Sequence, residues 1–71
     1  MALTCTLDFE MAQRKLTNVM LAEMTGVHRS SIAKLRRNTF LYIDAKALEK
    51  ICLALDLEPG DLLQIEREAN S

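Results

Sequence analysis

The chain has 71 residues, of which 49% are hydrophobic and 27% charged, and its formal net charge is −1 at pH 7. These values fit a single small, mostly helical globular domain over residues 1–71 better than an intrinsically disordered segment, because disordered chains are poor in hydrophobic residues. No apolar run approaches the ~20 residues of a membrane span, and no charged start precedes an apolar signal core, so we expect a cytoplasmic protein without a membrane segment.

The first predicted element is a strand at the start of the chain, where Leu3, Cys5 and Leu7 alternate with threonines. Alternation with a period of two is typical of a half-buried strand. Near the other end, the segment LLQIER repeats the pattern with Leu63 and Ile65. We expect these strands to pair, within one chain or across a dimer, because each alone would leave a row of unpaired backbone groups.

Two short helices are predicted next, joined by a turn that holds a glycine. Thr17 is suited to cap a helix over residues 18–24, and Gly26 supplies the left-handed conformation that ends it. A second helix over residues 28–37 starts within three residues. Two short helices around such a turn predict a helix-turn-helix over residues 18–37.

The second of these helices has a polar and basic outer face. Ile32 and Leu35 mark the side that turns toward the core. On a helical wheel the residues opposite the core are Ser30, Ala33, Lys34 and Arg37, with Arg29 and Arg36 at the margins. No acidic residue lies on this face.

The rest of the chain predicts one longer helix and a short closing one. The segment IDAKALEKICLALDL places Ala47, Leu48, Ile51 and Leu55 on one side, which predicts an amphipathic helix with Asp44 as its N-cap. Pro59 favours a helix that starts there, because the first helical turn tolerates a missing N–H.

Several apolar side chains have no firm place in this pattern. We interpret Met11, Met20 and Met24 as core or near-core residues. Phe9 is either exposed or buried by an N-terminal helix, and we expect Tyr42 to pack under its loop more readily than to contact a phosphate.

Together these elements make the chain resemble the Cro/phage-repressor-type helix-turn-helix regulators, the XRE family, over about residues 7–65. The stretches TNVMLAEMTGVHRSSIAKLRR and LEKICLALDLEPGDLL carry the resemblance. It implies a mostly α, lambda-repressor-like five-helix DNA-binding domain with a short two-stranded β-sheet formed by the N- and C-terminal segments. Two departures stand out: His28 replaces the usual Ser or Thr helix cap, and Asn38-Thr39 replaces the more usual Asn-Gly.

The resemblance also implies which residues contact DNA. Asn18 occupies the position that commonly touches a phosphate, Arg29 and Ser30 the first recognition-helix positions, and Lys34 the reader one turn later. With the basic outer face and the loop after it, the predicted DNA-binding residues are Asn18, His28, Arg29, Ser30, Ala33, Lys34, Arg36, Arg37 and Asn38.

Charge is segregated along the chain. Residues 24–43 carry four basic side chains and no acidic one, a local charge of +4, so the remainder must sum to −5 to give the total of −1. A small nucleic-acid reader needs this arrangement, because one basic face meets the phosphates.

Catalysis, cofactors and metals have little support in the sequence. His28 is the only histidine and has no evident nucleophile or ligand cluster, and no glycine-rich phosphate loop is present. Cys5 and Cys52 are neither dense enough for a disulfide framework nor close enough for a metal or redox motif, so we expect both to be reduced core residues. We expect a protein that is not an enzyme and binds no cofactor or small molecule.

Three functions remain open. The first, which we favour, is a sequence-specific regulator of transcription, expected to be a repressor, which binds a palindromic operator in double-stranded DNA as a homodimer. The second is a DNA-binding antitoxin or accessory partner of a co-encoded protein. The third is a protein-interaction module that kept the scaffold and lost DNA binding, against which the basic outer face argues.

Overall fold

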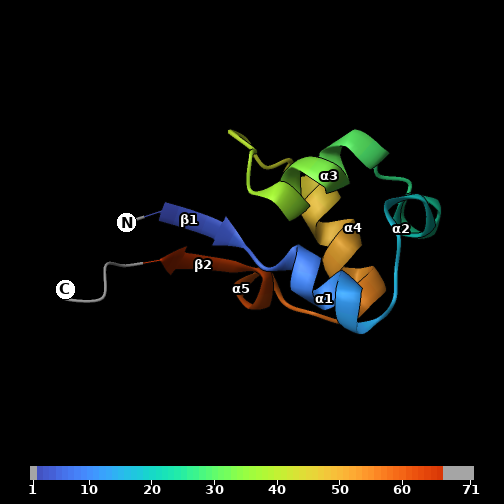
Figure 1. Cartoon of the computed structure of the whole chain (residues 1–71). Helices are drawn as coiled ribbons and strands as arrows, with labels where there is room; N and C mark the ends of the chain where they lie inside the picture. Colours follow the sequence, from blue (N-terminus) through green and yellow to red (C-terminus); the bar gives the residue numbers. More distant parts are fainter. Residues whose placement is uncertain (1, 67–71) are drawn as a thin grey trace.

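The computed structural model of the chain describes residues 2–66, which form a mostly helical bundle and a two-stranded sheet (Figure 1). In chain order the elements are β1 (Ala2–Cys5), α1 (Leu7–Gln13), α2 (Asn18–Thr25), α3 (Arg29–Arg37), α4 (Ala45–Leu55), α5 (Pro59–Leu62) and β2 (Leu63–Glu66). This arrangement of five helices and a sheet confirms the expected fold class. Within residues 2–66 no helix combines the length and apolarity needed to cross a membrane.

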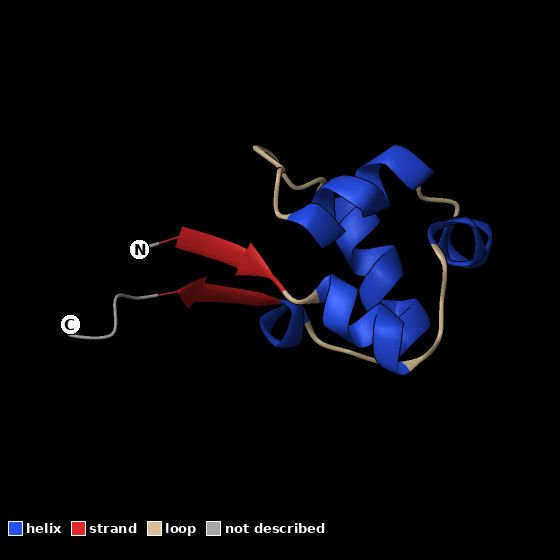
Figure 2. Cartoon of the chain, in the orientation of Figure 1, coloured by secondary structure: helices blue, strands red, loops and turns tan. Residues whose placement is uncertain are grey.

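The two strands pair with each other inside the chain. They run antiparallel, with Leu3 opposite Ile65 and Cys5 opposite Leu63. Figure 2 shows that β1 and β2 together form a two-stranded ribbon, the β1–β2 ribbon, which extends from one end of the helical bundle. Of the two pairings left open by the sequence, the structure therefore has the one within a single chain.

The prediction that the first strand reaches Leu7 was wrong. The strand ends at Cys5, and Leu7 begins α1 with its side chain fully buried. The apolar residues Leu7 and Met11 are four apart and both buried, which is the spacing of one face of a helix. The alternation of Leu3, Cys5 and Leu7 thus runs across the boundary of two elements by coincidence.

One core joins all five helices to the inner end of the ribbon. Its buried members are Cys5, Leu7, Met11, Leu21, Val27, Ile32, Leu35, Ile51, Cys52, Leu55 and Leu62. Both cysteines are free thiols within this cluster, as expected. Burial raises the pKa of the Cys5 thiol, and it raises the pKa of the Cys52 thiol together with the nearby carboxylates of Glu58 and Asp61.

Two of the three methionines expected in or near the core lie on the surface. Met11 is buried, but Met20 and Met24 are about half exposed on α2. Only Leu21 of α2 is buried, so this short helix presents one narrow side to the core. Within residues 2–66 no further element covers the rest of α2. Phe9, left open by the sequence, is exposed on α1.

In the loop between α3 and α4, some apolar side chains face the core and others face solvent. Phe40 and Ile43 pack against the core, whereas Leu41 and Tyr42 are almost fully exposed. The expectation that Tyr42 packs under the loop was therefore wrong. The two inward side chains already anchor the loop, which leaves the tip between them turned to solvent.

Candidate nucleic-acid interface

The turn between α2 and α3 sets the geometry of the site. The Thr17 side chain caps α2 by accepting a hydrogen bond from the Met20 N–H, at 3.1 Å. Gly26 ends the helix with φ of 79°, a left-handed conformation that side chains with a Cβ adopt only with strain. Both predictions of the sequence are confirmed. The chain then extends for two residues before α3 begins.

His28 is the N-cap of α3. Its Nδ1 accepts a hydrogen bond from the Ser30 N–H at 3.1 Å and lies 2.8 Å from the Ser30 hydroxyl. An imidazole nitrogen thus accepts the capping hydrogen bond that a Ser or Thr oxygen usually accepts at a helix start. Because Nδ1 accepts, the proton of the neutral ring is on Nε2, the nitrogen that is not occupied by this cap.

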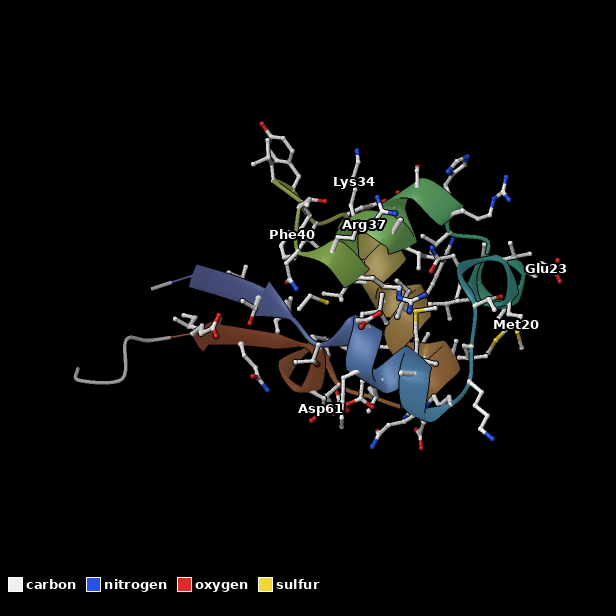
Figure 3. The ribbon with its side chains drawn as sticks, in the orientation of Figure 1. Met20, Glu23, Lys34, Arg37, Phe40 and Asp61 are labelled. Carbon is white, nitrogen blue, oxygen red and sulfur yellow. The ribbon has the colours of Figure 1, made fainter. Side chains whose placement is uncertain are left out.

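The outer face of α3 is exposed and basic. Arg29, Ser30, Lys34 and Arg37 are exposed, and Ala33 between them is partly buried. In Figure 3, Lys34 projects from α3 away from the helical bundle, whereas Asp61 lies on the opposite side of the molecule. Ile32 and Leu35 turn into the core. The residues expected to read DNA therefore share one accessible surface.

Arg36 is placed differently from the other cations of α3. Its Nε donates a hydrogen bond to the Asp8 carboxylate of α1 at 2.8 Å, and its Nη2 lies 2.6 Å from the same oxygen in an ion pair. Its Nη1 donates to the Asn18 Oδ1 of α2 at 2.7 Å. One side chain thus connects three helices. Because Asn18 Oδ1 accepts from Arg36, the amide NH₂ of Asn18 is the group left to donate elsewhere.

A comparison with known proteins identifies this arrangement. The family model for the Cro/C1-type HTH DNA-binding domain matches residues 6–68. The chain belongs to this family. It is also 30% identical, over all 71 of its residues and 84% of the relative's length, to a Bacillus subtilis (strain 168) protein named "Uncharacterized HTH-type transcriptional regulator YozG". The resemblance to XRE-family regulators is confirmed.

In this Cro/C1-type domain Asn38 joins the end of α3 to the sheet. It takes the left-handed conformation with φ of 59°, which Asn tolerates better than most residues. Its side-chain Oδ1 accepts from the Cys5 N–H, and its Nδ2 donates to the Cys5 carbonyl at 3.4 Å. The Asn side chain is therefore engaged with β1, and the loop shape left open by the absence of Asn-Gly follows from this contact.

Two acidic residues near the interface were missed in the sequence. Asp8 offsets the charge of Arg36, so the free cations of α3 are Arg29, Lys34 and Arg37. Glu23 of α2 lines a shallow hollow with His28 and Arg29. Asp8 lies 28 residues before Arg36 in the sequence, so no spacing rule would have connected them. The α2–α3 contact that brings Glu23 near Arg29 follows from the helix-turn-helix itself.

Proposed function

We propose that this chain is a sequence-specific regulator of transcription that binds double-stranded DNA through α3. The observation that carries the proposal is the exposed outer face of α3, where Arg29, Lys34 and Arg37 are free of acidic partners on the same helix. Such a face attracts phosphates and presents side chains of the size needed to reach base edges in the major groove. The family and the regulator named among its relatives support this assignment.

Base reading falls to the residues of α3 from Arg29 to Lys34. Arg29 and Lys34 are the two cations with the reach to contact the O6 and N7 atoms of guanine, and Ser30 adds a hydroxyl between them. Ala33 presents a small apolar surface that suits the methyl group of thymine. His28 stands at the entrance of this helix, where its free Nε2–H is available to the DNA backbone.

Phosphate contacts surround this reading surface. The Asn18 side chain is held by Arg36, and we expect its amide NH₂ to donate to a phosphate at the start of α2. Arg37 supplies a cation beyond the reading residues. The exposed Tyr42 in the α3–α4 loop adds a phenolic donor. Arg36 acts through Asn18 in this scheme, and Asn38 acts through the position of the loop, because both side chains are already bonded within the protein.

In this proposal, transcription is regulated by whether the protein occupies its operator. We propose that two copies bind a palindromic operator in the cytoplasm and repress by excluding polymerase from an overlapping promoter. Two subunits place two recognition helices on half-sites about 34–36 Å apart, which multiplies the few bases that one helix reads.

A second function is favoured by a separate surface. Residues of α4, of α5 and of the turn between them line a groove of about 500 Å³. The lining includes the exposed Leu53 and the acidic residues Glu49, Asp56, Glu58 and Asp61. A groove of this kind suits an antitoxin or accessory role, in which a co-encoded protein covers it while α3 holds DNA. Co-expression with the product of the neighbouring reading frame, followed by purification of a stoichiometric complex, would favour that role.

Selection of bound duplexes from a random DNA pool tests the main proposal. The expected result is an enriched palindrome with two half-sites one helical turn apart. The control is a variant with Arg29, Lys34 and Arg37 all replaced by Ala. Enrichment of the same palindrome by this variant would show that α3 is not the reader. No enrichment with the wild-type chain would count against DNA reading itself.

A further inference from the structure

We propose that a second copy of this chain docks on the outer apolar face of the β1–β2 ribbon, the face made by Leu3 and Ile65. This inference rests on the proposed function and deepens it, because it names the surface that joins two DNA-reading subunits. It is carried by the exposure of that face, by the state of the ribbon's two edges and by its charge.

The apolar face of the ribbon continues past the core into solvent. Leu3 lies opposite Ile65, one step outward from the pair of Cys5 and Leu63, so all four side chains share one face. The inner pair is covered, since Cys5 is buried and Leu63 packs against the core. The outer pair is not: Leu3 is 51% and Ile65 56% exposed.

The shape of the molecule explains this exposure. The ribbon projects beyond the helices, which cover only its inner end (Figures 1 and 2). An isolated pair of strands is marginally stable in water, and a covered apolar face is what usually stabilises it. The outer end of the ribbon therefore gains from a partner that packs on Leu3 and Ile65.

The edges of the ribbon are less available than its face. The Thr6 N–H donates to the Leu62 carbonyl at 2.7 Å, so by the alternation of an antiparallel ladder the backbone groups of Cys5 and Leu63 point outward. Asn38 bonds those of Cys5, and the Leu63 N–H donates to the Pro59 carbonyl. A strand added at either edge would find the inner half occupied, which favours docking on the face.

The charge of the ribbon favours a second copy as the occupant. Among residues 2–5 and 63–66, Glu66 is the one carboxylate or cationic side chain. A two-fold axis brings Leu3 of one copy against Ile65 of the other and meets little like-charge repulsion. The α4–α5 groove differs, because two copies meeting there would oppose two sets of four carboxylates.

The position of the ribbon is compatible with binding of both subunits to DNA. It leaves the bundle next to the end of α3, where Asn38 holds β1, whereas Lys34 points out from α3 into solvent (Figure 3). Two copies joined at their ribbons thus keep both α3 faces free. Because the apolar contact is small, the dimer is expected to dissociate on dilution and to be reinforced when both half-sites are present.

The test compares Ile65→Glu and Leu3→Glu with Leu53→Glu, a matched control that puts the same charge on an apolar residue 75% exposed on α4. All three sites are exposed, so circular dichroism should show the wild-type fold. In sedimentation equilibrium up to high micromolar concentration, we expect the wild type and Leu53→Glu to approach twice 8.0 kDa and both ribbon variants to stay at 8.0 kDa. On DNA, the ribbon variants should keep the affinity and base preference for a single half-site and lose cooperativity between two.

Other outcomes distinguish failure of the ribbon interface from failure of the proposed DNA-binding function. Dimerisation of either ribbon variant as strong as that of the wild type would overturn the ribbon as the interface, and so would a monomeric Leu53→Glu, which would place it in the α4–α5 groove. A wild type that is monomeric at every concentration and occupies two half-sites independently would overturn it as well. A wild type that dimerises through the ribbon and selects no DNA sequence would instead contradict the proposed function and leave the ribbon interface standing.

Discussion

At the scale of single residues, the basic side chains of α3 have different tasks. Arg29, Lys34 and Arg37 are exposed and free to contact DNA, whereas Arg36 is bonded to Asp8 and Asn18. Asp8 is mostly exposed, so this ion pair adds little to stability by itself. The ion pair with Asp8 instead orients the Arg36 guanidinium. The guanidinium in turn orients the Asn18 amide.

Replacement of Arg29 by Ala should weaken binding to the selected operator by about 1–3 kcal/mol and relax the preference at one base position. The reason is the loss of a side chain that donates to a base edge. Affinity measured against a panel of single-base variants of the operator checks this. Lys50→Ala, which removes an exposed cation from α4, is the control and should leave the preference unchanged; a wild-type base preference in Arg29→Ala would remove Arg29 from the readers.

A double-mutant cycle should show that Arg36 acts through Asn18. If Arg36 only orients the Asn18 amide, the losses in DNA affinity from Arg36→Ala and Asn18→Ala will not add in the double variant. The same cycle with Arg37→Ala in place of Arg36→Ala should be additive, because Arg37 makes its own phosphate contact. Additivity in the first cycle would mean that Arg36 contacts DNA independently.

At the scale of elements, the helix-turn-helix depends on its turn and caps. Gly26 closes α2 in a left-handed conformation, His28 opens α3, and Asn38 closes it in another left-handed conformation. Each of these residues satisfies a geometric demand of the backbone. The orientation of α3 relative to α2 is therefore set by local chemistry as well as by the packing of Leu21 and Ile32.

Gly26→Ala should destabilise the protein by about 1–2 kcal/mol through backbone strain, since φ is 79° and a Cβ there meets no atom within 4 Å. Gly60→Ala is the matched control: its Cβ also meets nothing within 4 Å, and its φ is not positive. That change should be neutral or stabilising by up to about 1 kcal/mol. Chemical denaturation of both variants measures the difference, and equal effects would show that the turn tolerates a side chain.

At the scale of the whole molecule, one core connects both ends of the chain. Cys5 on β1 and Cys52 on α4 belong to the same buried cluster, although 46 residues separate them in the sequence. Alkylation of either thiol therefore requires an opening of this core. Labelling with iodoacetamide in the native state, followed by mass spectrometry, should modify both slowly and at similar rates, whereas fast labelling of Cys5 alone would show that the ribbon opens independently.

Stability should also fall at alkaline pH because of these thiols. The pKa of each is raised in the folded protein above its ordinary value of 9.0, chiefly by burial, so the unfolded chain loses these protons first. The stabilising contribution is complete below pH 9 and is lost as the pH rises through the folded pKa values. The free energy of unfolding measured from neutral to alkaline pH should decline less steeply in Cys52→Ala; an equally steep decline would assign the effect to other groups.

Much of this architecture could be predicted from local patterns. Thr17, Gly26 and Asp44 were recognised as helix boundaries because capping chemistry acts over three or four residues, and Pro59 begins α5 as expected. The period of α4 was equally plain, with Ile51 and Leu55 buried. Where two patterns overlapped, as at Leu7, the sequence was ambiguous, and the apolar methionines of α2 gave no sign that a small core would leave them exposed.

The order and type of most elements, the family and the basic outer face of α3 could be inferred from the amino-acid sequence alone, because periodicity, capping and charge are properties of neighbouring residues. Three features became known from the folded structure: the two strands pair within one chain, Arg36 is bonded to Asp8 and Asn18, and Asn38 connects α3 to β1. The side-chain contacts join residues that are 18, 28 and 33 positions apart in the sequence, and the strand pairing joins the two ends of the chain. The free energy that selects such partners comes from burying one shared core, and no short stretch of sequence contains that information.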